Sequence, residues 1–256
     1  MNRRPKSDAQ ERLMLRGWNV MVLFAIVLAA CGGGGSNGSA KTARRGIGLE
    51  DLDGDGEVFV IAFGDSITRG VGDGARGDTV PPLATGGYPA RLQRLVGVPV
   101  LNFGVPGEQT AQGRARLPKV LQATRTDYVI LLEGVNDVEH RLDGDAIRNL
   151  QGMIDSVFQS GAMPIVGTLT PTCCDHRNTA PESRILRFND TLRAMAESQS
   201  VPVIDFHTAF GPDPTIGFDP ASGSIHVPEG LHPTSPGYDL MAATAAEAFE
   251  PGSAST

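Results

Sequence analysis

The sequence is poor in the residues that mark small cross-linked domains and nucleic-acid-binding proteins. Only 3 of its 256 residues are Cys, which excludes a small fold held together by disulfides. The 22 Lys and Arg are outnumbered by 29 Asp and Glu, so the chain lacks the basic excess that a nucleic-acid partner requires. Hydrophobic residues still make up 40% of the chain. This composition predicts one large core or two small ones, and it excludes a coiled coil or a disordered tail.

The N-terminal residues show a strongly uneven distribution of charge. Five basic residues precede an apolar stretch from Trp18 to Ala30, which only Asn19 interrupts. This stretch has 13 residues, whereas a membrane-spanning helix needs about 20. We therefore expect residues 1–30 to form a secretory signal peptide that is removed after export.

The end of this segment, Leu28-Ala29-Ala30-Cys31, resembles the lipobox of bacterial lipoproteins. The resemblance implies a lipid on the Cys31 thiol and an exported protein anchored to a membrane. An ordinary cleaved signal with a chance Cys is the alternative. Because Gly32 follows Cys31, where Asp would favour the inner membrane, we expect the outer membrane, facing the periplasm, if the host has two membranes.

Residues 31–57 lack the apolar periodicity of a folded element and predict a flexible, Gly-rich and then acidic linker. Its end, Asp51 to Gly56, resembles the start of a calcium-binding loop, with acidic residues at Asp51, Asp53 and Asp55. Ala62 stands where such a loop has its bidentate Glu, and a predicted strand follows where a helix is needed. We therefore interpret these residues as an acidic linker end, with calcium binding as the alternative.

From residue 58 to 250, short apolar runs alternate with amphipathic segments. The five runs are Val58–Phe63, Val98–Phe103, Tyr128–Glu133, Met163–Thr168 and Val201–Asp205. Helical periodicity is clearest over Asp145–Ser160, with Ile147, Leu150, Ile154, Val157 and Phe158 on one stripe, and over Glu182–Ser198. Strand and helix in alternation predict a parallel sheet covered on both sides, that is, one three-layer α/β/α domain. Residues 251–256 are a short tail.

Polar and glycine-rich residues follow several of the predicted strands. They are Gly64 to Thr68, Gly104 to Gln109 and Gly134 to Asp137, and Glu229 to Pro233 lie near the C-terminus. Ligand sites of parallel α/β sheets lie outside the carboxyl ends of the strands, so these segments predict one site. Ser66 needs a neighbouring base to become a nucleophile, and His232 is the best candidate of the five His because an acidic residue precedes it by three positions.

Four blocks resemble, in this order, those of the SGNH hydrolases, also called the GDSL esterase/lipase family: Gly64 to Thr68, Asn102 to Gly104, Gly134 to Asp137 and Gly230 to Pro233. The resemblance covers residues 58–250 and implies a flavodoxin-like fold with a five-stranded parallel sheet. It implies Ser66 as the nucleophile and His232 as the general base. It also implies an oxyanion hole formed by the N–H groups of Ser66 and Gly104 and by the Asn136 side chain, with no cofactor.

The chain departs from the family pattern at the triad acid, because Glu229 stands where the family usually has Asp. A longer side chain must bend back to reach the same imidazole nitrogen, so Asp219, Asp205 or a backbone carbonyl remain alternatives. Asp65 is expected to accept backbone N–H bonds in the nucleophile turn. We leave Asp137 and Tyr88 out of the catalytic set.

Four other histidines, His140, His176, His207 and His226, show no paired metal-ligand spacing, so no metal is assigned. The adjacent Cys173 and Cys174 are either bonded to each other, in a strained ring, or two free thiols. A catalytic Cys is not expected, because Ser66 has the better-placed partners.

The expected activity is hydrolysis of carboxylic esters, or of thioesters, through an acyl-enzyme. Asn102 to Gln112 and Leu131 to Gly134 resemble the thioesterase/arylesterase branch, which implies small or medium acyl groups on a small-molecule or lipid ester. One alternative is a cell-envelope carbohydrate or peptidoglycan O-acetyl esterase, although 1 Trp and 3 Tyr offer little aromatic surface for sugars. The other is a lipoprotein that binds lipid or glycan without turnover. The oligomeric state stays open.

Overall fold

The computed structural model describes residues 46–73, 86–172, 180–211 and 230–250 of the chain. The predicted signal peptide, Cys31, the Cys173–Cys174 pair and Glu229 lie outside these ranges. Within the described residues, no helix combines the length and the apolar character needed to cross a bilayer.

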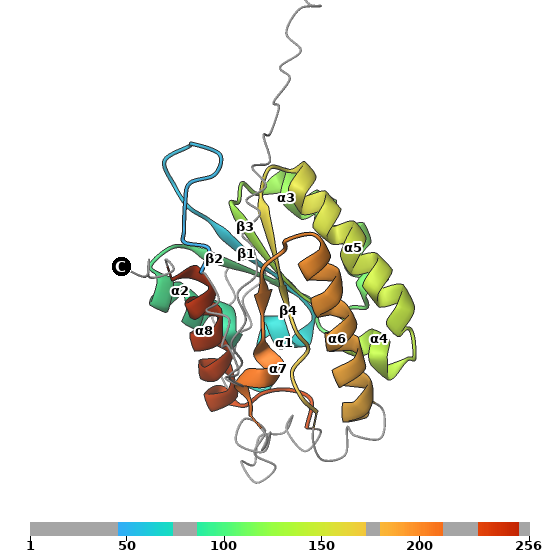
Figure 1. The fold of residues 1–256 in the computed structure, drawn as a ribbon. Helices are drawn as coiled ribbons and strands as arrows, with labels where there is room; N and C mark the ends of the chain where they lie inside the picture. Colours follow the sequence, from blue (N-terminus) through green and yellow to red (C-terminus); the bar gives the residue numbers. More distant parts are fainter. Residues whose placement is uncertain (1–45, 74–85, 173–179, 212–229, 251–256) are drawn as a thin grey trace, which may run out of the picture. The chain divides into compact units, whose positions relative to one another are not determined.

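Five parallel strands form one sheet, as the sequence predicts (Figure 1). They are β1 (Val60–Gly64), β2 (Val100–Gly104), β3 (Tyr128–Leu132), β4 (Met163–Gly167) and β5 (Val203–Ile204), in the order β2-β1-β3-β4-β5. Every residue of β1 and β3 is buried, because helices cover both faces of these central strands. The predicted three-layer α/β fold is confirmed.

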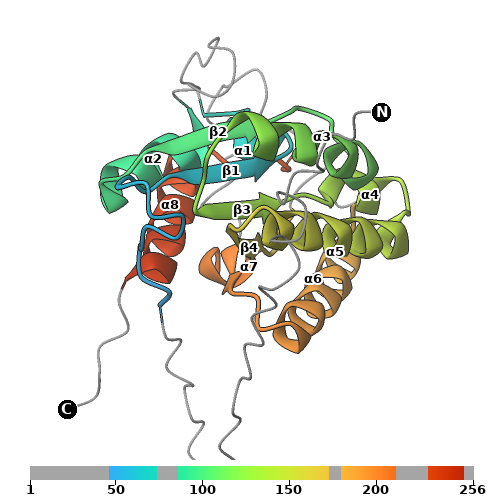
Figure 2. The same ribbon diagram turned by 90° about the horizontal axis from the view of Figure 1, so that it is seen from above.

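The long helices lie in two layers (Figures 1 and 2). On one face of the sheet, α2 (Gly87–Val96) packs against α8 (Ser235–Phe249). On the other face, α5 (Asp143–Gln159) packs against both α3 (Thr110–Ala123) and α6 (Glu182–Ser198). The chain runs from β1 to β2 at one edge, and then crosses back to β3 on the other side of β1 and continues to β4 and β5. Because each crossover is right-handed, this reversal of direction places the connecting helices on opposite faces of the sheet.

Three short helices follow strand ends: α1 (Ser66–Arg69) after β1, α4 (Val135–Glu139) after β3, and α7 (Phe206–Ala209) after β5. The register pairs Gly64 with both Gly104 and Leu132. The carboxyl ends of β1, β2 and β3 are therefore level, and the residues that follow them share one edge of the sheet.

The core contains most of the predicted apolar stripes. Ile185, Phe188 and Leu192 of α6 are buried, and so are Leu150, Ile154 and Val157 of α5. The prediction for Phe158 is wrong: its side chain is 49% exposed. Phe158 lies in the last turn of α5, next to the buried Val157. Neighbouring side chains on a helix point about 100° apart, so with Val157 in the core Phe158 points toward solvent.

Residues 46–57 lie against the domain, although the sequence predicts a flexible linker there. The N–H of Ile47 donates to the carbonyl of Ala248 at 2.8 Å, and that of Glu50 to the Tyr128 hydroxyl at 2.8 Å. The buried Asp127 carboxylate accepts the N–H groups of Leu52 and Phe59 at 2.7 and 2.8 Å. These hydrogen bonds do not require apolar residues at a regular spacing, so the sequence pattern does not reveal them.

Candidate active site

Ser66 is the first residue of α1, directly after the end of β1. Asp65 caps this helix: its Oδ1 accepts the N–H of Ile67 at 2.9 Å, as expected for a residue that holds the turn. Gly64 allows the turn to pass close to the sheet, because a Cβ there would overlap the carbonyl oxygen of Leu132 and the side chain of Thr68. The Ser66 hydroxyl is thereby held at the edge of the sheet, and the residue is 5% exposed.

Asp65 has an unusual proton affinity for a carboxyl group. Complete burial raises its pKa to about 7, the hydrogen bond from Ile67 opposes this, and the acidic side chains of Glu108 and Asp137 raise it further. Near neutral pH, Asp65 therefore exists partly as the neutral acid. This is the behaviour of a buried cap and not of a group that must carry a fixed negative charge.

Ser66 and His232 meet in the folded protein. The Nε2 atom of His232 lies 2.8 Å from the Oγ of Ser66, although 166 positions separate them. His232 stands in the segment that leads into α8, whose N-cap is Thr234. The distance is that of a hydrogen bond, so an unprotonated Nε2 can accept the hydroxyl proton.

Two contacts attach the His232 segment to the nucleophile segment. The Ser235 hydroxyl lies within hydrogen-bond distance of the Asp73 carbonyl and of Asp73 Oδ1, at 2.7 and 2.6 Å. The Tyr238 hydroxyl donates to the carbonyl of Val71 at 2.7 Å. Val71 and Asp73 follow α1 directly, so these bonds tie the start of α8 to the turn that carries Ser66.

Asp73 is itself fixed by Arg91 of α2, which donates to both carboxylate oxygens at 2.6 and 2.7 Å. The N–H of Gly87 donates to the same carboxylate at 2.8 Å. Burial alone would raise the pKa of Asp73, but the hydrogen bonds from Arg91, Ser235 and Gly87 outweigh burial and lower the pKa below its ordinary value. Asp73 thus stays ionised and links α2, α8 and the nucleophile segment.

Asn136, on α4, is 9% exposed and lies beside the loop that follows β2. Its Nδ2 donates one hydrogen to the main-chain carbonyl of Glu108 at 2.8 Å. The amide nitrogen carries a second hydrogen, which is available for an oxyanion. Gly134 is the N-cap of α4 and has φ at 126°. A Cβ there would overlap the ring of Phe188, so only glycine lets α4 start at this point.

Gly104 does not have the geometry expected of an oxyanion donor. Its N–H already donates to the Asn102 side chain at 2.9 Å, and the Asn102 amide donates in turn to the carbonyl of Thr68 at 2.9 Å. A Cβ at Gly104 would overlap the main chain of Arg69 and Asp65. Gly104 therefore serves the close approach of α1 to β2.

Gly107, in the loop that follows β2, has an available amide. Gly107 is exposed, has φ at 75°, and its N–H makes no hydrogen bond with the described residues. It immediately precedes Glu108, whose carbonyl contacts Asn136. The Pro106-Gly107 pair is a turn signal that sequence reasoning passed over.

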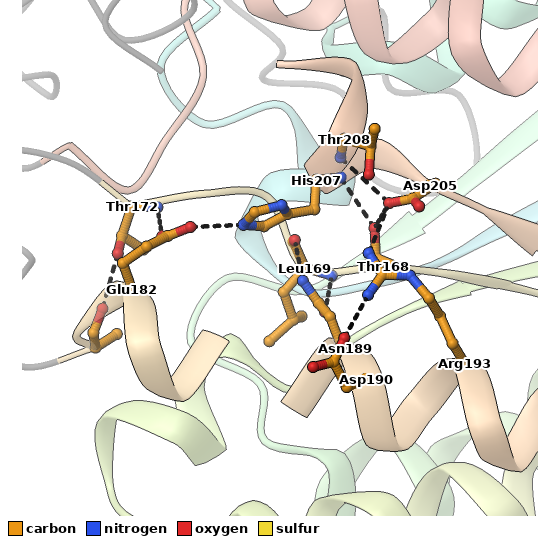
Figure 3. Close-up of polar contacts among 11 residues, drawn as sticks. Thr168, Leu169, Thr172, Glu182, Asn189, Asp190, Arg193, Asp205, His207 and Thr208 are labelled. Atoms are coloured by element: carbon orange, nitrogen blue, oxygen red, sulfur yellow. Dashed lines mark hydrogen bonds and ion pairs between the residues drawn. The ribbon is translucent and has the colours of Figure 1, made fainter. Parts of the chain in front are cut away.

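Asp205, one alternative for the triad acid, is engaged elsewhere (Figure 3). Its Oδ1 accepts hydrogen bonds from the Thr168 hydroxyl at 3.1 Å, from Arg193 at 3.0 Å and from the N–H of Thr208 at 3.2 Å. Burial alone would raise the pKa of Asp205, but Arg193 and Thr208 lower it to about 2. Asp205 thus caps α7 and pairs with α6. Glu229 and Asp219 lie outside the described residues, so the triad acid stays a prediction.

Several other described polar groups near this edge make contacts of their own. His207 Nε2 lies 2.6 Å from Glu182 Oε1, and the other carboxylate oxygen of Glu182 accepts the N–H of Thr172 (Figure 3). Asp137 accepts two bonds from Thr110, from its N–H at 2.9 Å and its hydroxyl at 2.8 Å. Tyr88 is fully buried. His140 Nδ1 lies 2.6 Å from the Asn136 carbonyl.

One group of described acidic residues has oxygen atoms within 4.8 Å of one another: Asp51, Asp53 and Asp127. The two oxygens of Asp51 accept the N–H groups of Gly54 and Gly56 at 2.6 and 2.8 Å. Those of Asp127 accept Leu52 and Phe59. Asp51 and Asp127 therefore fold the loop before β1 by accepting main-chain N–H groups. Their presence is explained without a calcium ion.

Comparison with known proteins identifies the family of this chain. A sequence profile of the GDSL-like lipase/acylhydrolase family matches residues 62–240, more than half of the chain. No protein with a curated description matches the sequence significantly.

Solved structures give matches over nearly their whole length. A lipase/acylhydrolase from Enterococcus faecalis is 26% identical, with a TM-score of 0.62 over 77% of this chain and 100% of that one. A lipolytic G-D-S-L family protein from Veillonella parvula is 26% identical, with a TM-score of 0.60 over 75% of this chain and 98% of that one. An acetylxylan esterase from Geobacillus stearothermophilus, solved as a catalytic mutant, is 19% identical, with a TM-score of 0.61 over 76% and 94%.

Proposed function

The chain belongs to the GDSL-like lipase/acylhydrolase family and is an ester hydrolase of this type, and we propose that it acts through an acyl-enzyme on Ser66. The observation that carries the proposal is the 2.8 Å distance between Ser66 Oγ and His232 Nε2. A serine hydroxyl is a weak nucleophile until a base within hydrogen-bond reach takes its proton.

The reaction has two halves. In the first, Ser66 Oγ attacks the ester carbonyl carbon, His232 Nε2 takes the hydroxyl proton, and the tetrahedral intermediate collapses as the alcohol leaves with that proton. In the second, His232 takes a proton from water, the hydroxide attacks the acyl-enzyme, and the acid leaves as Ser66 regains its proton. In both halves a negative charge develops on the former carbonyl oxygen.

That charge needs fixed hydrogen-bond donors. We propose the N–H of Ser66, the second amide hydrogen of Asn136 and the N–H of Gly107. Gly107 replaces Gly104 in this set, because the Gly104 amide is bonded to Asn102. In amide NMR spectra, reaction of Ser66 with a phosphonate should shift the Gly107 proton and leave that of Gly104 nearly unchanged. The reverse pattern would restore Gly104 to the oxyanion hole.

For the substrate, we propose small or medium acyl esters, with thioesters included. A carbohydrate O-acetyl ester is the second candidate. The matched esterase from Geobacillus stearothermophilus acts on acetylxylan, so this fold serves that reaction in another protein. A non-catalytic lipid- or glycan-binding lipoprotein is the third, and intact contacts around Ser66 speak against it.

Hydrolysis of p-nitrophenyl esters of increasing acyl length tests these alternatives together. A maximum at medium chains supports the first candidate, acetate as the best substrate supports the O-acetyl esterase, and no turnover supports the binding protein. The Ser66→Ala variant is the control. Activity that survives this substitution would rule out the mechanism.

We also propose that Cys31 carries the lipid and that the protein is exported and membrane-anchored, in the outer membrane if the host has two. The support is the lipobox-like segment and the apolar stretch before it. Labelling with radioactive palmitate should mark the full chain and not the Cys31→Ala variant. Labelling of both proteins would contradict the proposal.

A further inference from the structure

A part-buried ion pair holds the side chain of Glu108, the residue whose main-chain carbonyl accepts a hydrogen bond from the Asn136 amide. Arg116 of α3 binds the Glu108 carboxylate with two donors, Nε to Oε1 at 2.8 Å and Nη2 to Oε2. The Glu108 side chain is 5% exposed. A carboxylate bound by both arms of a guanidinium has little freedom to turn, so Glu108 is fixed in the loop between β2 and α3.

Arg116 is itself fixed by the two strands next to it. Its Nη2 donates to the carbonyl of Phe103 at 3.0 Å, and its guanidinium lies 3.9 Å above the ring of Phe63. Phe63 is in β1 and Phe103 is in β2. Through Arg116, Glu108 is therefore held against β1 and β2, and Ser66 lies just after the end of β1.

A second carboxyl group faces this pair. Glu133, the residue after β3, is 1% exposed. Its carboxyl group fills the space that a side chain at position 113 would need, so Gly113 of α3 is what makes room for it. Burial raises the pKa of Glu133 well above its usual range, and the Glu108 carboxyl raises it further. Burial thus favours the neutral form of Glu133 beside the Glu108 carboxylate.

We propose that Glu108 is a positioning residue for the oxyanion donor Asn136, with its side chain clamped by Arg116 and its main-chain carbonyl holding the Asn136 carboxamide. The inference rests on the proposed serine-esterase function. The bond from Asn136 Nδ2 to the Glu108 carbonyl, 2.8 Å long, fixes one amide hydrogen and thereby aims the other. Gly107 precedes Glu108, so the same clamp also sets the direction of its N–H.

The Glu108→Gln variant tests the clamp, because it keeps the size of the side chain and the main-chain carbonyl but loses the ion pair with Arg116. A misplaced oxyanion donor weakens transition-state stabilisation more than substrate binding. We expect kcat to fall about 10- to 100-fold, with KM changed less than about threefold. If this variant does not fold, Arg116→Lys keeps the charge, loses the two-armed contact, and should show the same split.

Asp143→Asn is the matched control. It removes another two-armed pair, in which Arg184 of α6 binds the Asp143 carboxylate at the start of α5. A loss of kcat that merely reflects a missing ion pair would appear here as well. We expect kcat of this variant to stay within about twofold of wild type.

The decisive measurement is the double variant. If Glu108 acts through Asn136, adding Glu108→Gln to Asn136→Ala should lower kcat by less than about threefold beyond Asn136→Ala alone. Effects that multiply in full would overturn the proposal, and so would a Glu108→Gln enzyme with wild-type kcat. Ser66→Ala distinguishes failure of the positioning role from failure of the proposed function. If Ser66→Ala is inactive while Glu108→Gln has wild-type kcat, only the positioning role fails. If Ser66→Ala remains active, the proposed function itself fails.

Discussion

The Ser235 hydroxyl and the Asp73 carboxylate, 2.6 Å apart, join the segment of the catalytic base to the segment of the nucleophile. Asp73 lies shortly after α1, and Ser235 is the first residue of α8. Together with the Tyr238–Val71 hydrogen bond and the packing of α8, this link helps to set the distance between His232 and Ser66. The geometry of the site is therefore supported by a charged group that does not take part in the chemistry.

Asp73→Asn should loosen this link. The variant keeps a polar side chain but loses the charge that Arg91 and Ser235 bind, so we expect a loss of about 2–3 kcal/mol in the free energy of unfolding and a lower kcat. Urea unfolding measures the first effect and ester hydrolysis the second. Asp190→Asn is the control, since the exposed Asp190–Arg193 pair should contribute less than about 1 kcal/mol. Equal losses in both variants would contradict the role of Asp73.

Gly104→Ala and Gly107→Ala should separate the two glycines of the β2–α3 loop. The added methyl group overlaps main-chain atoms at Gly104, which should cost about 1–3 kcal/mol or more of stability. At Gly107 nothing lies within 4 Å of the added Cβ, so only the strain of a positive φ remains, about 1 kcal/mol. Thermal unfolding of both variants gives the comparison. A Gly104→Ala protein as stable as Gly107→Ala would be inconsistent with the packing described.

Asp65 should make stability depend on pH. Its pKa is about 7 in the folded protein and about 3.8 in the unfolded chain, so the folded state holds the proton more tightly. The stability contributed by the neutral form is complete below pH 3.8 and decreases as the pH rises to about 7.

Asp65→Asn removes this titration and keeps an acceptor for the Ile67 N–H. The free energy of unfolding of the variant, relative to wild type, should therefore increase between pH 4 and pH 8. Urea titrations at a series of pH values measure it. A difference that does not vary with pH would show that Asp65 stays ionised in the folded protein.

Glu229→Gln tests the triad acid. If Glu229 orients His232 and stabilises its protonated form, kcat should fall by about 10⁴-fold, since the amide favours the wrong tautomer of the imidazole. The same kinetic measurement on Asp205→Asn should show a much smaller change, because Asp205 binds Arg193 and Thr208. A loss below about tenfold in Glu229→Gln would remove it from the site.

The sequence alone was sufficient for the architecture. The five apolar runs are too short for helices and rich in Val, Ile and Leu, so they specify buried parallel strands, and the segments between them specify the covering helices. It also pointed to Ser66 and His232, because their flanking residues follow strand ends or resemble a known family. It could not show that Phe158 faces solvent, since one apolar residue at a helix end fits two orientations.

The tertiary structure decided which partner each polar group binds. The end of β2 and the residues after it offer two glycines in four residues, and only the bond from Gly104 to Asn102 distinguishes a structural amide from an available one. Likewise, no spacing in the sequence brings Asp73 to Ser235 or Arg116 to Glu108. Local hydrophobic periodicity is written along the chain and fixes the strands and helices. The direction of a single polar group is set by partners that only folding brings together.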